Sequence, residues 1–149
     1  MAQAMAASPP ITTRSTRIAG TPNAVGEAMT AFARLFELGW LPEARRADVE
    51  LVVAEVLNNI VEHALAGRED AWIELAVTAE GGRVFVMTAD DGCPLPSPLL
   101  AIAELPAQDP QTGDLPEGGF GWFIIHALTE DMTYERADGL NRLHFSFVI

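Results

Sequence analysis

The sequence predicts an α+β fold, a two-layer sandwich in which helices cover one face of a mixed, mostly antiparallel sheet. Segments that alternate apolar and polar residues mostly come in pairs joined by short turns, as in antiparallel hairpins. Other segments repeat an apolar residue every three or four positions, as in helices that pack on a core. With 149 residues, 49% of them hydrophobic, the chain suits one domain with a proper core. We expect that domain over residues 11–149, after a disordered tail at residues 1–10.

The first elements are expected to be an edge strand and a helix. Residues 11–19 are rich in Thr and Ile and alternate loosely, which predicts the strand. Thr21 and Pro22 predict the helix start, with Thr21 as N-cap and the proline in the first turn. The helix should run to about Leu38 and end at Gly39, because glycine readily takes the left-handed conformation that ends helices. The side chains expected in the core are Val25, Met29, Phe32 and Phe36.

A long second helix is predicted after Pro42. Residues 48–65 contain neither Gly nor Pro and repeat an apolar residue every three or four positions. Glu55, Asn59 and His63 recur every four residues in this stretch, so they should lie on one side of the helix, one turn apart. Polar groups beside an apolar stripe cost free energy unless they are paired or face a ligand. The spacing alone is compatible with a partly buried polar seam or with a binding face.

Two hairpins and a third helix complete the predicted fold. The strands are expected at residues 71–78, 83–89, 133–136 and 143–148. Gly81 and Gly82 predict a tight turn in the first hairpin, and Asp138 and Gly139 predict one in the second. The apolar run at residues 120–128 predicts a helix with a glycine-rich entry. Both strand pairs are joined by turns too short for a parallel connection, which supports the α+β class.

Residues 91–117 are expected to form a long loop. They contain six prolines and no sustained periodicity, although residues 99–105 could make a short helix. A connection of this length is uncommon in a compact domain and is usually functional, often a lid over a site. The alternative is an insertion that is merely flexible.

Charge and composition exclude several classes of protein. Acidic residues outnumber basic ones by 21 to 9, the net charge is -12, and lysine is absent. This opposes binding to nucleic acid and favours either simple solubility or contact with a basic protein partner. No apolar stretch approaches the roughly 18 to 20 residues that cross a membrane, and residues 1–10 lack the basic start and apolar middle of a signal peptide, so we expect a cytoplasmic protein that binds no membrane. The single cysteine, Cys93, excludes an intrachain disulfide.

Two further motifs flank the predicted loop. Asp90 ends a strand and is followed by Gly92; such an aspartate can accept a hydrogen bond from an exocyclic amine, as on adenine, while glycine lets a flat ring approach the backbone. A plain turn is the alternative. Residues 117–122, Glu-Gly-Gly-Phe-Gly-Trp, open a helix whose N-terminal N–H groups would suit phosphate. A flexible hinge for the loop is the alternative there.

Together, the polar line around Glu55 and these two motifs resemble the N, G1 and G2 boxes of the Bergerat-fold ATPases. That superfamily includes gyrase, the heat-shock chaperone, histidine kinases and mismatch-repair ATPases. Within it, the chain resembles the anti-sigma-factor serine kinases, small bacterial proteins that consist of this domain. The resemblance extends from about Ile18 to Phe147 and includes the hairpin at residues 134–143 that is typical of this branch. One departure is Trp122, which stands where the family usually has leucine.

The resemblance implies a role for each matching residue. Glu55 matches the general base that takes the proton of a protein serine hydroxyl, and Asn59 matches the asparagine that coordinates Mg²⁺ between the phosphates. Asp90 matches the aspartate that recognises the adenine amine, with Gly92 beside the base. His63 falls where this branch often has histidine and would border the nucleotide. The residues that match the phosphate-binding loop are Gly118, Gly119, Phe120 and Gly121.

The function implied by the resemblance is an ATP- and Mg²⁺-dependent protein serine kinase that also sequesters a sigma factor. Its substrate would be a serine of a STAS-type anti-anti-sigma protein, and it would act as a homodimer. The helix at residues 21–38 and its surroundings are expected to form the dimer and sigma-binding face. Two alternatives stay open: a module that needs ATP for its shape but transfers no phosphate, and a related ATPase or sensor with a target other than a sigma factor.

Overall fold

The computed structural model describes residues 12–96 and 119–149. The elements are β1 (Thr12–Ala19), α1 (Pro22–Glu37), the 3₁₀ turn η1 (Glu43–Arg45), α2 (Arg46–Asn59), the π-helical turn η2 (Ile60–Ala64), β2 (Trp72–Glu80), β3 (Arg83–Asp90), α4 (Gly119–Leu128), β4 (Glu130–Ala137) and β5 (Leu140–Val148). The tail predicted at residues 1–10, the possible helix at 99–105 and most of the predicted lid lie outside the described residues. None of the described helices is both long enough and apolar enough to span a membrane.

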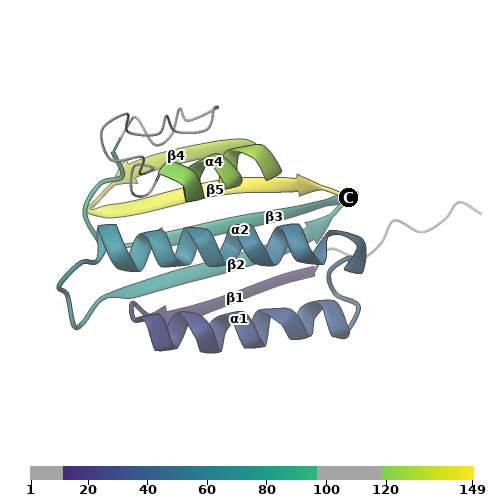
Figure 1. The fold of residues 1–149 in the computed structure, drawn as a ribbon, viewed down its shortest axis with the longest axis horizontal. Helices are drawn as coiled ribbons and strands as arrows, with labels where there is room; N and C mark the ends of the chain where they lie inside the picture. Colours follow the sequence, from purple (N-terminus) through teal and green to yellow (C-terminus); the bar gives the residue numbers. More distant parts are fainter. Residues whose placement is uncertain (1–11, 97–118) are drawn as a thin grey trace, which may run out of the picture.

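The five strands form one antiparallel sheet in the order β1-β2-β3-β5-β4. Helices α1, α2 and α4 lie side by side on one face of it (Figure 1). This confirms the predicted two-layer α+β fold. The prediction of a mixed sheet is wrong for the described strands, because every pair is antiparallel. Strand β4 runs in the same direction as β3, but β5 lies between them and no parallel pair forms.

The local signals that begin and end elements are confirmed. The hydroxyl of Thr21 accepts a hydrogen bond from the N–H of Ala24 at 3.1 Å, which satisfies a free donor of the first turn of α1. Both hairpin turns have positive φ at their two central residues: 57° and 76° at Gly81 and Gly82, and 54° and 75° at Asp138 and Gly139. Turns of this conformation match the right-handed twist of the strands they join.

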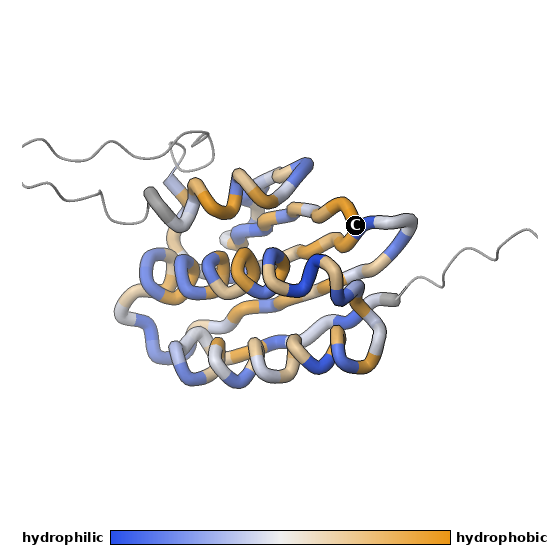
Figure 2. Tube along the Cα trace, turned by 45° about the vertical axis from the view of Figure 1, so that its right-hand side comes forward, coloured by the Kyte–Doolittle hydropathy of each residue, from blue (hydrophilic) through white to orange (hydrophobic). Residues whose placement is uncertain are grey.

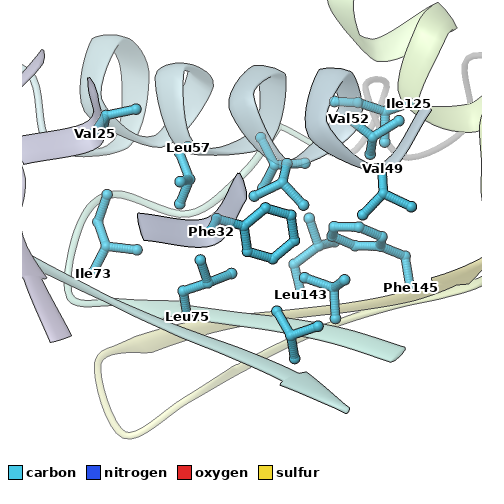
Figure 3. Close-up of a cluster of buried hydrophobic side chains, with 14 of the residues drawn as sticks. Val25, Phe32, Val49, Val52, Leu57, Ile73, Leu75, Ile125, Leu143 and Phe145 are labelled. Carbon is cyan, nitrogen blue, oxygen red and sulfur yellow. The ribbon is translucent and has the colours of Figure 1, made fainter. Parts of the chain in front are cut away.

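The core lies between the helices and the face of the sheet that they cover. In β2, Ile73, Leu75 and Val77 point into it, while the residues between them are only partly buried. Figure 3 shows side chains from α1, α2, α4 and the strands meeting there, and in Figure 2 hydrophobic and hydrophilic positions alternate along α1 and α2, as expected for helices with one buried side. Met29, predicted to be buried, is partly exposed.

The core and the open face of the sheet should respond differently to the same truncation. Phe145 of β5 is fully buried, whereas Phe85 of β3 is 41% exposed on the other face. We expect Phe145→Ala to lower the free energy of unfolding by about 3–5 kcal/mol, because it leaves a cavity. Phe85→Ala, the matched control, should change it by about 0.5 kcal/mol or less. Chemical denaturation measures both, and equal losses would contradict this assignment of the two faces.

Candidate functional site

A cavity of about 260 Å³ opens between the C-terminal part of the α2–η2 helix and the strands β3, β4 and β5. Its wall is largely apolar and includes Val56, Ile60, Leu95, Trp122 and Leu143. Its polar residues are Asn59, His63, Thr88, Asp90, Cys93, Tyr134 and Asn141. A concave, mostly apolar wall with a few polar groups is typical of small-molecule sites. The cavity brings together three of the predicted site residues, namely Asn59, His63 and Asp90.

Asp90 lies at the C-terminal end of β3 and is only 3% exposed. Its Oδ1 accepts two hydrogen bonds, each 2.9 Å long, from the N–H of Gly92 and from Nδ2 of Asn141. Burial raises the pKa of Asp90, and the hydrogen bonds from Asn141 and Gly92 oppose this rise. Both hydrogen bonds use Oδ1, so within the described part of the chain Oδ2 is left to accept a hydrogen bond from a molecule in the cavity.

Gly92 is required by a contact inside the protein. A Cβ atom at this position would lie 2.4 Å from the carbonyl oxygen of Ala64, a backbone atom that cannot move aside cheaply. The same carbonyl accepts the N–H of Cys93 at 2.9 Å. The turn after Asp90 therefore packs directly on η2. The predicted place of Gly92 beside a ligand ring stays a prediction.

The second helix changes its winding in the middle of the predicted polar line. After Asn59 it continues as the π-helical turn η2, in which the N–H of Leu65 donates to the carbonyl of Ile60 at 2.9 Å. The continuous α-helix predicted over residues 48–65 is therefore wrong beyond Asn59, and the four-residue spacing no longer aligns His63 with it. The His63 side chain is 51% exposed, and its Nε2 lies 4.0 Å from Oε2 of Glu62.

Glu55 and Asn59 meet the start of α4. A Cβ atom at Gly121 would lie 2.7 Å from Oε2 of Glu55 and 3.6 Å from Nδ2 of Asn59, so glycine allows the close approach of the two helices. Nδ2 of Asn59 is buried and has no hydrogen-bond partner among the described residues. Oδ1 of Asn59 is the kind of oxygen ligand that Mg²⁺ accepts, whereas the unpaired Nδ2 is a donor and suits a phosphate oxygen. These residues therefore fit a Mg²⁺–nucleotide.

The structure describes only some of the other residues that are predicted to bind phosphate. Gly119 and Phe120 form the first turn of α4, so their backbone stands at the N-terminal end of a helix, as predicted. Gly118 lies outside the described residues. None of the nine arginines of the chain lines the cavity, and the chain has no lysine.

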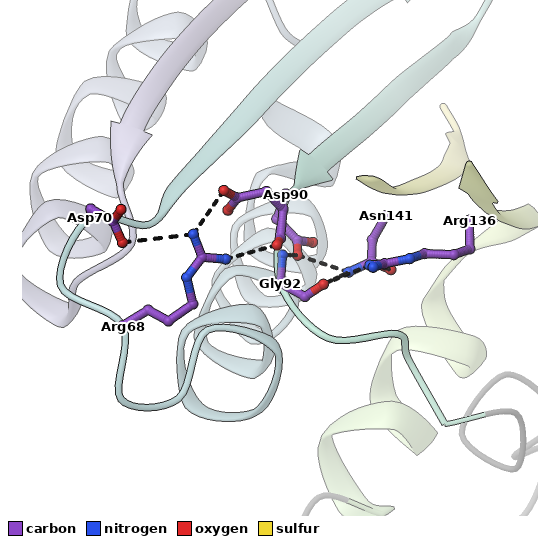
Figure 4. A network of polar contacts seen from close by, with 7 residues as sticks. Arg68, Asp70, Asp90, Gly92, Arg136 and Asn141 are labelled. Carbon is purple, nitrogen blue, oxygen red and sulfur yellow. Dashed lines mark hydrogen bonds and ion pairs between the residues drawn. The ribbon is translucent and has the colours of Figure 1, made fainter. Parts of the chain in front are cut away.

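Three residues of the C-terminal hairpin support the site, although the sequence alone indicated no role for them. Asn141 of β5 is 5% exposed, and its Oδ1 accepts hydrogen bonds from Tyr134 and Arg136 of β4 at 2.6 and 3.0 Å. Arg136 also donates to the carbonyl of Gly92 at 2.6 Å (Figure 4). The available signal was a polar residue, Asn141, at a position where the alternation of β5 requires a buried side chain.

A second arginine holds the same turn from the opposite side. Nη1 of Arg68 donates to the carbonyl of Asp91 at 2.8 Å, and its Nη2 donates to the Asp91 carboxylate at 2.9 Å. Asp70 lies 3.7 Å from the same guanidinium. Figure 4 shows the turn after Asp90 between Arg68 and Arg136. The two arginines bind backbone carbonyls there, so their role in this structure is to fix the turn.

Comparisons with known proteins agree with the fold. Residues 18–147 match the family model of the histidine kinase-like ATPase domain. The serine/threonine-protein kinase BtrW from Bordetella bronchiseptica is 31% identical over 98 residues, which are 66% of this chain and 67% of BtrW. The SiaB–SiaC complex from Pseudomonas aeruginosa contains a similar fold, with a TM-score of 0.61, 19% identity and coverage of 91% of this chain and 89% of that one.

Two further solved structures share the fold. One contains the RsbU and RsbW domains of a Mycobacterium tuberculosis protein, with a TM-score of 0.60 and 19% identity; the match covers 92% of this chain but only 32% of that chain. The other is the catalytic domain of histidine kinase ThkA, with a TM-score of 0.53, 15% identity and coverage of 91% of this chain and 95% of that one.

The contact between Gly92 and Ala64 predicts a large effect of one methyl group. Gly92→Ala should lower the free energy of unfolding by about 1–3 kcal/mol, because the new Cβ overlaps a backbone carbonyl. The control is Gly26→Ala in α1, where a Cβ would meet nothing within 4 Å. That substitution should stabilise the protein by about 0.5–1 kcal/mol, since it removes glycine from a helix interior. Thermal denaturation separates the two, and a neutral Gly92→Ala would contradict the packing described.

The raised pKa of Asp90 predicts a pH-dependent cost of keeping it buried. An acid whose pKa is higher in the folded than in the unfolded state binds more protons when folded, so the free energy of unfolding falls as the pH rises through that window. Asp90→Asn keeps an acceptor oxygen but cannot ionise. We expect it to be more stable than wild type at pH 7, with the difference shrinking as the pH falls through the raised pKa of Asp90 to the ordinary range of aspartate and staying constant below it.

Urea denaturation over a pH series measures this difference. Glu80→Gln, at an exposed acidic residue that ends β2, controls for the loss of one surface charge. A stability difference between Asp90→Asn and wild type that is independent of pH would contradict the prediction.

Proposed function

The chain belongs to the histidine kinase-like ATPase domain family, as its sequence motifs predicted, and on this basis we propose that it is an ATP-dependent protein serine kinase. The observation that carries the proposal is the convergence of three elements on one cavity. Asp90 from the end of β3 and Asn59 from the end of α2 line it, and Glu55 lies one turn before Asn59, against the glycine-rich start of α4. Asp90, which would recognise the base, and Asn59 and Glu55, which would act in phosphate transfer, would thus act on the same bound nucleotide.

Each residue would have a defined task. The free Oδ2 of Asp90 would accept a hydrogen bond from the exocyclic amine of adenine, inside a wall that is otherwise mostly apolar. Asn59 would hold Mg²⁺, which when bound neutralises phosphate charge and orients the phosphates. Glu55 would take the proton of the attacking serine hydroxyl, as a general base. Phosphoryl transfer depends mostly on such positioning and charge stabilisation.

The charge distribution supports a particular way of binding the triphosphate. No arginine lines the cavity, and lysine is absent from the chain. The N–H groups at the start of α4, from Gly119 to Gly121, would therefore be the main protein donors to the phosphates, aided by the positive end of the helix dipole. Gly118 would extend this set. His63, half exposed at the cavity wall, would border the nucleotide.

The partners follow from the family branch that the sequence resembles. We propose that the chain sequesters a sigma factor and phosphorylates a serine of a STAS-type anti-anti-sigma protein, acting as a homodimer in the cytoplasm. The similarity to BtrW, a serine/threonine-protein kinase, supports the transfer step. The same fold in the RsbW domain and in the SiaB–SiaC complex is compatible with it. The net charge of -12 is compatible with a basic protein surface as a partner.

Binding and transfer should respond separately to two substitutions. Glu55→Ala should still bind Mg²⁺–ATP but transfer phosphate to a STAS partner about 10²–10⁴-fold more slowly, because a general base is lost. Asn59→Ala should lose the Mg²⁺-dependent part of ATP binding. Calorimetry and radiolabel transfer measure the two effects. The controls are Asn58→Ala and Glu62→Ala, at exposed positions of the same helix, which should behave as wild type.

Three outcomes would contradict the proposal in different ways. ATP binding without transfer to any STAS partner would favour the module that needs ATP only for its shape. Full transfer by Glu55→Ala would exclude Glu55 as the base. Failure of wild type to bind ATP would leave the cavity without its proposed ligand.

A further inference from the structure

We propose that Asn141 is a positioning residue for base selection: held by Tyr134 and Arg136, it fixes the Asp90 carboxylate so that its free oxygen accepts the exocyclic amine of a purine. This inference rests on the proposed nucleotide binding in the cavity. It assigns the C-terminal hairpin a part in choosing the ligand. Asn141 itself lines the cavity, but its amide oxygen and nitrogen are hydrogen-bonded to protein groups, so we infer that it acts through Asp90.

The sheet register places Asn141 where it can act on Asp90. The two residues are direct partners in the β3–β5 ladder, and both are buried. Nδ2 of Asn141 donates to Oδ1 of Asp90 at 2.9 Å and to the carbonyl of Cys93 at 2.8 Å, with the carbonyl of Gly92 further away at 3.4 Å. One amide group therefore binds the carboxylate and the turn that follows it.

The neighbours of Asn141 determine which way its amide faces. Arg136 donates to Oδ1 of Asn141 at 3.0 Å, and a guanidinium can only donate. The hydroxyl of Tyr134 already accepts the N–H of Leu95 at 2.9 Å, so its single proton goes to Oδ1 of Asn141, at 2.6 Å. A flipped amide would point its N–H groups at both donors. The N–H groups must therefore face Asp90.

This orientation determines what Asp90 can offer a ligand. Its Oδ1 is occupied by two N–H donors, from Asn141 and Gly92, so the proton that burial favours can sit only on Oδ2. The hydrogen bond from Asn141 opposes that protonation, because it lowers the pKa that burial raises. Asn141 thus favours the ionised form of Asp90, in which Oδ2 is an acceptor, and holds the carboxylate plane in place.

An acceptor at this position distinguishes between purines. A base with an amino group at C6 can donate to Oδ2 of Asp90. A base with hydrogen at C6 leaves this buried oxygen unpaired. A base with a carbonyl at C6 places its oxygen next to Oδ2, so that two acceptors face each other without a proton between them. Sites built around one hydrogen bond reject ligands that cannot make it, because a buried polar group is then left without a partner.

The test compares ATP with purine riboside 5′-triphosphate, which lacks the amino group, by calorimetry on the full chain. Wild type should bind ATP at least about tenfold more tightly than the analogue. Asn141→Ala should lose most of this preference by weakening ATP binding, while the affinity for the analogue stays within about threefold. Tyr134→Phe, which removes one oxygen and keeps the ring in the cavity wall, should weaken the preference in the same direction.

His144→Ala, at an exposed position of the same strand, is the control and should keep the wild-type preference. Thermal denaturation identifies any variant that fails to fold, and Tyr134→Phe then carries the test. If Asn141→Ala weakened the binding of ATP and of the analogue equally, the inference would be overturned, because Asn141 would then have a structural role alone. An unchanged preference would overturn it as well. A wild type that binds both nucleotides equally would refute base selection by Asp90 but keep the nucleotide site, whereas binding of neither would refute the site itself.

Discussion

The Asp90 carboxylate is buried and accepts hydrogen bonds, and much of the surrounding structure supplies the donors or fixes the turn that follows it. Removing a carboxylate from water is costly unless hydrogen bonds replace the water. Here, the N–H of Gly92 and the amide of Asn141 do so on one oxygen, which leaves the other for the cavity. Because Asn141 belongs to β5, the site depends on the pairing of β3 with β5 in the observed register. A shift of one residue would turn Asn141 to the other face of the sheet.

The π-helical turn and the glycine after Asp90 are two parts of one contact. In η2 the helix widens at the point where the turn packs on it. The carbonyl of Ala64 then accepts the N–H of Cys93 from the turn, and only a residue without a side chain fits at position 92. π-Helical turns occur frequently at functional sites, where they change the direction of side chains. In this chain the change separates Glu55 and Asn59, which contact α4, from His63, which lies half exposed at the edge of the cavity.

The parts of the fold that could be predicted from sequence are those specified by neighbouring residues. The Thr21 cap, the turn at Gly81 and Gly82 and the alternation of β2 depend on contacts a few positions apart, and the structure confirms them. The π turn was not predicted from neighbouring residues, and its carbonyl at Ala64 is bound by the N–H of Cys93, which lies far along the chain. The order of the strands could not be predicted from neighbouring residues either, because β5 pairs with β3, which lies far from it in sequence.

The same distinction between local and long-range contacts applies to the candidate site. Motif spacing and family resemblance indicated Asn59 and Asp90, and the fold brings both to one cavity. The contact of Asn141 with Asp90 depends on the pairing of β5 with β3, which neighbouring residues in the sequence do not specify. Four buried side-chain atoms of the described residues lack a hydrogen-bond partner, and those of Asn59 and Trp122 belong to residues that line the cavity. Such groups cost about 1–3 kcal/mol each, and native proteins accept that cost mainly where a ligand can offset it. Two of the four unpaired atoms of the described residues therefore belong to the wall of the cavity, where the proposed ligand would supply partners.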